Sequence, residues 1–340
     1  MIKCVFTVDY EVYGDGTGSL AELAYEPTER LRDLFADAGS RFVLFPDVAE
    51  LEIIEAADAD AAMPRVADQI RCLYDEGFEI GLHLHPGWYN ASQASRVWSL
   101  DYSEYNLCAL AEDRLVEIVD RGIRYLRRLL GQPTFTPLSF RAGHLLFQPT
   151  QPLARVLDMR GVRIDSSVYK GGRWSEHHLD YRRALRNGYF WRFGDEIDVP
   201  SARGDLFEIP IYTDMVPVWR LLTTKRIGLQ RSGLLPGRGR RTLLSRLSSC
   251  IRRQPLKLDF CHMTMREITR VFSKILEEDR CDPMSRRPVV AIGHTKDLID
   301  LHTVDAFLTY LQANRIDVVT FSEILGWCDE HVAHHEGRAG

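Results

Sequence analysis

Two pairs of side chains that can bind metals stand at the ends of short apolar stretches. Asp9 and Glu11 close the stretch that begins at Ile2, and His83 and His85 close the stretch FEIGLHL. Successive side chains of a strand point to opposite faces, so the two members of each pair share one face. Two histidines and a carboxylate, with an open position for water, are a common catalytic metal site. Surface acids and satisfied core histidines are the simpler interpretation of these pairs.

Three further residues occupy the same kind of position. Arg141 lies in the apolar stretch LSFRA and, if buried, needs a carboxylate partner such as Asp9. Asp165 follows VRI and could orient a histidine or the arginine, or simply cap a turn. His294 follows VVAIG and could be a general acid near neutral pH, or a buried structural histidine.

Short apolar runs alternate with helical patterns along the chain, which predicts βα units and a mostly parallel sheet. We expect strands at 2–8, 41–45, 78–84, 138–142, 162–168, 206–212, 258–263, 289–293 and 317–320, and helices at 30–37, 67–74, 113–130 and 304–313. In a β/α barrel the carboxyl ends of the strands converge on one rim. The five motifs above would therefore meet in a single site.

Length and composition predict an ordinary globular protein. The 340 residues suit one domain over 1–330, with insertions near 170–205 and 215–257 and a polar tail at 331–340. The net charge of −5 gives no reason to expect nucleic-acid binding. Seven scattered cysteines predict neither a disulfide framework nor a cysteine zinc site. The strand pattern at the N-terminus leaves no room for a signal peptide, and no apolar run is long enough to span a membrane, so we expect a cytoplasmic protein.

One segment, between Asp214 and Asp259, contains no acidic residue. Its eleven cations are Arg220, Lys225, Arg226, Arg231, Arg238, Arg240, Arg241, Arg246, Arg252, Arg253 and Lys257. The stretch 220–257 could lie on an anionic membrane or contact phosphate groups, or it could be a solvated flap or an oligomer contact. The aromatic residues expected in loops near the rim could stack on sugars or simply pack; they are Trp88, Tyr89, Trp98 and Trp174.

Taken in order, these motifs resemble those of the polysaccharide deacetylase family, of the carbohydrate esterase family 4 type. TVDYE is similar to the family's first motif, EIGLHLHP to its second, RAG to its third, IDSSV to its fourth and IGHTK to its last. The common second motif has its second histidine four residues after the first, where this chain has Gly87. His85, two residues after His83, is the candidate in its place.

The resemblance implies a distorted (β/α)7 TIM-like barrel that removes N-acetyl groups from a sugar or glycoconjugate. It implies a divalent metal, with zinc as the expected ion, held by Glu11, His83 and His85. Asp9 would be the base, and the roles of the remaining motif residues follow from the family's pattern: Arg141 steadies Asp9, His294 protonates the leaving amine and Asp165 occupies the acidic position. An amidohydrolase acting on a non-sugar C–N bond and a non-catalytic glycan-binding relative remain alternatives. No phosphate-binding glycine loop follows a strand, so a nucleotide-binding fold is not expected.

Overall fold

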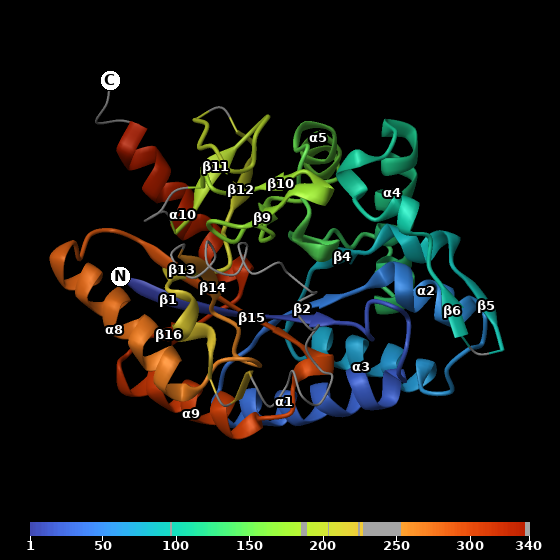
Figure 1. Cartoon of the computed structure of the whole chain (residues 1–340), viewed down its shortest axis with the longest axis horizontal. Helices are drawn as coiled ribbons and strands as arrows, with labels where there is room; N and C mark the ends of the chain where they lie inside the picture. The colour runs from blue at the N-terminus through green and yellow to red at the C-terminus, as the bar shows by residue number, and fades with distance from the viewer. Residues whose placement is uncertain (96, 185–188, 203, 224, 227–252, 337–340) are drawn as a thin grey trace, which may run out of the picture.

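The computed structural model describes the chain except residues 96, 185–188, 203, 224, 227–252 and 337–340 (Figure 1). Its central strand is β1 (Ile2–Tyr10), which is rich in β-branched and aromatic residues and buried along most of its length. On one side β1 pairs in parallel with β15 (Arg287–His294), and on the other with β2 (Val43–Pro46) and β16 (Asp317–Val318). This arrangement confirms the buried, parallel character that the sequence predicts for the first strand.

The strands form two half-sheets. The first has the order β15-β1-β2-β3, with β3 at Glu79–Ile80. The second has the order β11-β12-β8-β7-β4, where the bounds are β4 Leu82–Leu84, β7 Ser139–Ala142, β8 Ile164–Asp165, β11 Trp191–Phe193 and β12 Leu206–Glu208. The two half-sheets are joined where β3 continues through Gly81 into β4, beside a parallel bridge between Asp47 and His83, and again by a parallel bridge between Ile211 and Val290. The result is the distorted TIM-like barrel that we expect from the sequence.

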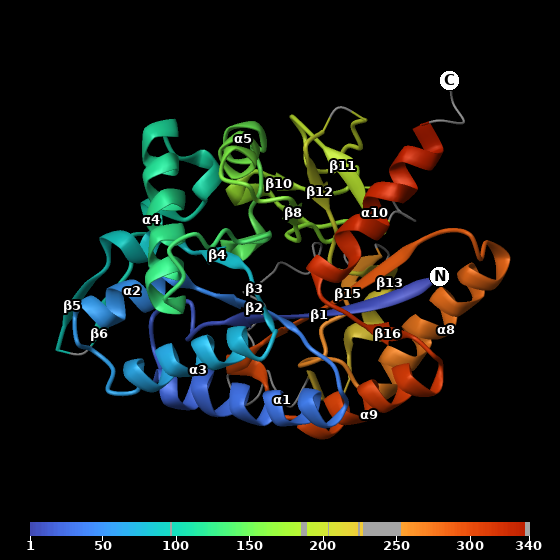
Figure 2. The same ribbon diagram turned by 180° about the vertical axis from the view of Figure 1, so that it is seen from behind.

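Helices cover the outside of this ring. Figures 1 and 2 show α1, α3 and α9 along one side of the strands and α4 and α5 on the opposite side. The bounds are α1 Glu26–Asp37, α2 Val48–Ala56, α3 Met63–Asp75, α4 Glu112–Leu130, α5 Gln151–Met159, α8 Met265–Cys281, α9 Leu301–Ala313 and α10 Phe321–Glu336. Local signals fix their ends. Gly131, at φ 65°, terminates α4 in the left-handed conformation, and Thr264 with Glu267 forms a capping box at the start of α8.

Alternation along β1 separates two cores. Phe6 and Val8 pack toward the outer helices, whereas Val5 faces the interior of the ring together with Ile164 and Ile292. Thr7, Asp9 and Glu11 follow Val5 at steps of two, so they share its face. The polar residues of β1 therefore occupy the inside of the ring at its carboxyl end.

Several expected boundaries differ from the structure. Residues 258–263 form no strand; Asp259 makes a single bridge to Ile292, and the hairpin β13 (Thr213–Val216)–β14 (Gln254–Lys257) precedes it. α2, α5, α8 and α10 are not among the helices expected from the sequence. α10 continues past residue 330, where the sequence predicts a polar tail. Within the described part of the chain, no helix is both long and apolar enough to cross a membrane.

The basic segment lies largely outside the described residues, because Arg231, Arg238, Arg240, Arg241, Arg246 and Arg252 all fall within 227–252. Two of its described cations have acidic partners inside the protein. Lys225 lies 2.9 Å from Asp300, and Arg226 lies 2.6 Å from Glu267. These pairs give the anionic-membrane and phosphate interpretations no support.

Candidate metal centre

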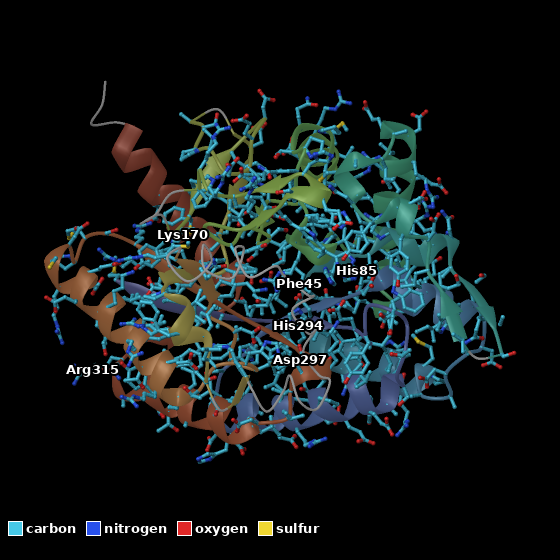
Figure 3. All side chains as sticks on the ribbon, viewed as in Figure 1. Phe45, His85, Lys170, His294, Asp297 and Arg315 are labelled. Carbon is cyan, nitrogen blue, oxygen red and sulfur yellow. The ribbon has the colours of Figure 1, made fainter. Side chains whose placement is uncertain are left out.

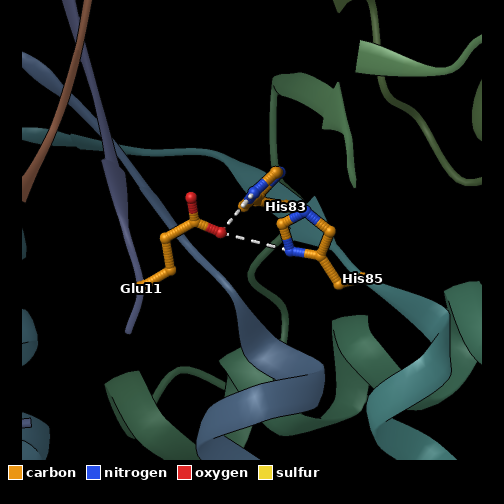
Figure 4. A group of neighbouring side chains, drawn as sticks. All are labelled: Glu11, His83 and His85. Atoms are coloured by element: carbon orange, nitrogen blue, oxygen red, sulfur yellow. Dashed lines mark ion pairs between the residues drawn. The ribbon is translucent and has the colours of Figure 1, made fainter. Parts of the chain in front are cut away.

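Glu11 and the two histidines of the HLH sequence come together at the carboxyl end of the strands. Figure 4 shows the Glu11 carboxylate facing both imidazole rings. Its Oε2 atom lies 3.6 Å from His83 Nε2 and 3.2 Å from His85 Nδ1. Both Glu11 and His83 are buried. These three residues form the group that the sequence motifs predict, and their ligand atoms lie close enough to share one metal ion.

His83 has the hydrogen-bonding pattern of a metal ligand. Its Nδ1 lies 2.9 Å from the carbonyl oxygen of Arg141, so this nitrogen must carry the ring proton. Its other nitrogen, Nε2, is buried, has no hydrogen-bond partner and faces the Glu11 carboxylate. Burial lowers the pKa of His83, but the carboxylates of Glu11 and Asp9 outweigh this and raise it to about 9, so Nε2 carries a proton at neutral pH. A cation bound between Nε2 and the Glu11 carboxylate would replace that proton.

His85 is held by residues that the sequence motifs do not include. Its Nδ1 lies 2.9 Å from Oδ2 of Asp47, and its Nε2 accepts a hydrogen bond from the backbone N–H of His144 at 3.2 Å. Since Nε2 is an acceptor, the ring proton lies on Nδ1. To bind a cation, His83 would therefore release a proton from Nε2, and His85 would move its proton from Nδ1 or turn its ring.

Asp47 is fully buried at the junction of β2 and α2. Its Oδ1 accepts hydrogen bonds from Ala49 N and Glu50 N, as the cap of α2, and from His85 N at 3.3 Å. One side chain thus starts a helix and fixes a candidate ligand. The signal in the sequence is an aspartate directly after the apolar run VLFP, the same kind of position as Asp9 and His294.

Arg141 and Asp9 form a buried ion pair beside this group. Arg141 Nη1 lies 2.6 Å from Asp9 Oδ1, Nη2 donates to Thr7 Oγ1 at 2.9 Å, and Nε donates to the carbonyl of Ser166 at 2.9 Å. Burial tends to raise the pKa of Asp9, but the charges of Arg141, His83 and His294 hold it below its usual value. Asp9 is consequently ionised at neutral pH, and the pairing predicted for Arg141 is present.

His294 stands next to Asp9 on the neighbouring strand, where β1 and β15 pair these two residues directly. Its Nε2 lies 3.5 Å from Asp9 Oδ2 and 4.0 Å from Glu11 Oε1. Burial holds the pKa of His294 below its usual value. Gly293 is required before it, because a Cβ there would lie 2.2 Å from the Phe260 ring.

The structure does not place Asp165 against His294 or Arg141. Its carboxylate accepts hydrogen bonds from the backbone N–H and hydroxyl of Ser167, both at 2.8 Å, and burial raises its pKa to about 6. The physical reason is topological, since β12 lies between β8 and the edge that meets β15. The acid on the Nδ1 side of His294 is Asp297, whose Oδ2 lies 3.9 Å from that nitrogen (Figure 3).

Two further cations, to which the sequence motifs assign no role, approach the site. Lys296 Nζ lies 2.8 Å from Glu11 Oε1. His262 lies between two carboxylates, with Nδ1 2.7 Å from Asp259 Oδ2 and Nε2 3.3 Å from Asp297 Oδ2. Burial lowers the pKa of His262, but these acids raise it to about 10. His262 is therefore a cation at neutral pH and fixes Asp297 beside His294.

The raised pKa of His262 predicts a pH-dependent contribution to stability. A histidine whose pKa is raised by folding stabilises the protein fully below its unfolded pKa of about 6.5, and this contribution is lost as the pH rises toward about 10. The free energy of unfolding of His262→Asn should therefore differ most from that of the unmodified protein near pH 6, and the difference should shrink by pH 10. Denaturant titrations at a series of pH values measure it. The exposed His302, changed to Asn, is the matched control, and an equal pH trend in that variant would contradict the prediction.

No protein-family model matches the sequence, and no curated protein sequence matches it. Solved structures do match the fold. A protein named as a polysaccharide deacetylase, from Mycobacterium smegmatis, has a TM-score of 0.52 at 15% identity, covering 98% of this chain and 92% of its own. The allantoinase Puue has a TM-score of 0.51 at 14% identity, covering 95% and 88%. A branching enzyme from Thermococcus kodakaraensis has a TM-score of 0.52 at 12% identity, covering 96% and 71%.

These proteins carry the names of different activities. At such low identity the comparison therefore establishes the fold of this chain, and its reaction has to be inferred from the residues of the site. The fold of this chain is the one found in a polysaccharide deacetylase and an allantoinase, and at the carboxyl ends of its strands it carries a Glu–His–His group.

Proposed function

We propose that this protein is a metal-dependent hydrolase that removes N-acetyl groups from a sugar or glycoconjugate. The observation that carries the proposal is the buried, unpartnered Nε2 of His83, which faces the Glu11 carboxylate at 3.6 Å. Glu11, His83 and His85 would hold the ion, and their mixture of imidazole and carboxylate suits zinc. The open side of the group leads into a pocket lined in part by Glu11, His85 and His144.

A divalent ion in this position would polarise the acetamide carbonyl and would make the attacking water easier to deprotonate. Asp9, held ionised by Arg141, takes the proton of the water that attacks the carbonyl carbon. His294 lies 3.5 Å from Asp9, so it can receive that proton on Nε2 and deliver it to the amine nitrogen as the C–N bond breaks. The products are acetate and the free amine. Asp297 faces the other ring nitrogen of His294 and stabilises the imidazolium that forms in between.

The neighbouring charges support these roles. Lys296 Nζ lies 2.8 Å from the Glu11 carboxylate and favours its ionised form. Burial tends to raise the pKa of Glu11, but Lys296, His85 and His83 outweigh burial and hold this pKa well below its usual value. An ionised carboxylate is what a metal ligand must be. Asp165 has no role in this mechanism. Asp297 instead orients His294, which is the role that the motif pattern would give to Asp165.

The substrate class rests on the sequence motifs and on the fold shared with a polysaccharide deacetylase. A second candidate is an amidohydrolase acting on a non-sugar C–N bond, favoured by the equally similar allantoinase. Both reactions need the same attacking water and the same proton donor. The two candidates therefore differ in how the substrate is recognised and share the catalytic groups.

The first experiment is the metal content of the purified protein, by elemental analysis, after purification with added zinc. We expect about one equivalent in the unmodified protein and none in the double variant His83→Ala, His85→Ala. His302→Ala is the matched control, since His302 is an exposed histidine on α9 and should leave the content unchanged. Metal that persists in the double variant would place the ion elsewhere, and absence of metal from all three proteins would remove the hydrolytic mechanism.

A further inference from the structure

A pocket of about 750 Å³ lies apart from the candidate metal centre. The loop after β8, the hairpin β13–β14 and α8 form its walls. Figure 3 shows Lys170, on one of these walls, well away from His85 and His294. None of the described residues that line this pocket also lines the one beside Glu11 and His85. Its volume lies within the range of small-molecule sites, so it is a candidate for a second ligand.

The described lining of this pocket is strongly basic. It contains five cations and one carboxylate, namely Lys170, Arg173, Arg182, Arg253 and Lys274, with Asp214 as the acid. Arg253 belongs to the basic segment that the sequence reveals, whereas the other four cations lie elsewhere along the chain. Folding therefore gathers charges that are far apart in the sequence. We call the space lined by these six residues the cationic pocket.

The carboxylates around the cationic pocket neutralise part of this charge. Two of the five cations have an acidic partner, and these ion pairs are Lys274 Nζ with Asp214 Oδ1 at 2.6 Å and Arg182 Nε with Asp180 Oδ1 at 2.7 Å. Arg173 and Arg253 are exposed and form no ion pair with any residue that the structure describes. Their guanidinium groups are consequently open to an anion that enters from solvent.

Lys170 is the buried member of the group. It is only 8% exposed, and its Nζ lies 5.6 Å from the centroid of the Tyr212 ring. Burial and the charge of Lys274 lower the pKa of Lys170 to about 8, although Glu278 and Asp214 partly oppose this shift. An ammonium group held in such surroundings costs free energy, and an anion bound beside it would offset part of that cost.

The turn that carries Lys170 is fixed by backbone hydrogen bonds. Gly171 N donates to Tyr181 O at 3.1 Å, and Tyr181 N donates to Gly172 O at 2.8 Å. Gly171 has φ 78°, and a Cβ there would lie 2.5 Å from Met215 Sδ on the hairpin, so this close approach requires glycine. This wall of the cationic pocket is therefore in place before a ligand binds, which reduces the entropy lost on binding.

We propose that the cationic pocket is a second binding site, separate from the metal centre, for a phosphorylated small molecule. A guanidinium group can donate two parallel N–H bonds to phosphate oxygens, and Lys170 adds a point charge on the buried side. A phosphate group offers three acceptor oxygens and a carboxylate only two, so phosphate makes fuller use of these donors. The rest of such a molecule has room against the Tyr169 ring, which also lines the pocket. The inference does not depend on which bond the metal centre hydrolyses.

The test measures the binding of inorganic phosphate and inorganic pyrophosphate by isothermal titration calorimetry at low ionic strength, where charge interactions are least screened. The pocket variant carries Arg173→Gln and Arg253→Gln, two exposed positions whose change should leave the fold intact. The matched control carries Arg128→Gln and Arg280→Gln, which remove the same charge from side chains that are 59% and 74% exposed. We expect the pocket variant to bind about 10-fold more weakly and the control to bind as the unmodified protein does.

Two further measurements separate the cationic pocket from other sources of phosphate binding. An anion could bind an ion in the metal centre, so the titration is repeated with the variant His83→Ala, His85→Ala, in which we expect the affinity to be retained. A lipid headgroup could supply the same phosphate chemistry. Co-sedimentation with phosphatidylcholine vesicles, with and without phosphatidic acid, measures this contribution, and we expect the two kinds of vesicle to bind equally little protein.

Four results would overturn the inference. The first is equal affinity of the pocket variant and the matched control for both anions. The second is loss of binding in the histidine double variant, which would place the anion on the metal. The third is binding to vesicles with phosphatidic acid without binding of the dissolved anions, which would make this face a membrane contact. The fourth is that neither anion binds the unmodified protein at millimolar concentration.

Discussion

Replacing His294 with alanine should lower kcat by about 10²- to 10⁴-fold on any N-acetylated substrate that the unmodified protein hydrolyses. His294 is the group within 3.5 Å of Asp9 that can carry a proton to the leaving amine, and the amine is a poor leaving group without one. It contributes nothing to the Glu11–His83–His85 group, so the metal content should be unchanged. Acetate release under saturating substrate, together with elemental analysis, measures both quantities.

A pair of aspartate variants makes this prediction sharper. Asp297→Asn should lower kcat and change its pH dependence, because Asp297 is the carboxylate that faces His294 Nδ1 at 3.9 Å. Asp165→Asn should leave the pH dependence as it is, because Asp165 bonds to Ser167 on a different part of the ring. If Asp165→Asn reproduces the effect of His294→Ala and Asp297→Asn does not, the proton path drawn here is wrong.

Replacing Arg141 with methionine should lower the free energy of unfolding by about 3–5 kcal/mol. Arg141 is fully buried, and its removal leaves the Asp9 carboxylate without its cation inside the ring. Three more groups lose a donor at the same time, namely the Thr7 hydroxyl and the carbonyl and hydroxyl of Ser166. Urea or guanidinium denaturation of the unmodified protein and the variant gives the difference.

The control for Arg141 is an arginine with a similar partner but a different environment. Arg128 pairs with Glu55 on the surface, and its side chain is 59% exposed. Arg128→Met should change the stability by about 1 kcal/mol or less, because water already solvates both charges. Equal losses in the two variants would mean that the packing of the long side chain, and not the buried charge of Asp9, accounts for the effect of Arg141.

Much of the site was predictable because its residues end buried strands. The apolar stretches before Asp9, His83 and His294 fix their strands locally, and parallel strands of a closed ring bring their carboxyl ends together. The spacing of two residues between Asp9 and Glu11, and between His83 and His85, determines which face each pair occupies. For these residues, the short segment around each one is enough to predict where the side chain lies and which way it points.

The remaining parts depend on which strands become neighbours, and short segments do not contain that information. Asp165 ends a strand like the others, yet β12 separates it from His294. Asp297 lies in the short helix η8 (Thr295–Asp297) and His262 in a turn, and the two meet because residues 258–260 pair with β15. Asp47 could be recognised as an acid after a strand, but its contact with His85 depends on the junction of β2 with β4, which no local pattern specifies.

Near the candidate metal centre the two half-sheets are joined by the bridge between Asp47 and His83 and by Gly81, which connects β3 to β4 and donates its N–H to Leu44 O at 2.8 Å, whereas β1 and β15 pair along their whole length. Glu11 follows β1 in one half-sheet, and His83 belongs to β4 in the other. An ion shared by these residues would therefore cross-link the two half-sheets. Its binding free energy would add to the resistance of the ring to opening. The same few atoms would then contribute both to the stability of the barrel and to its chemistry.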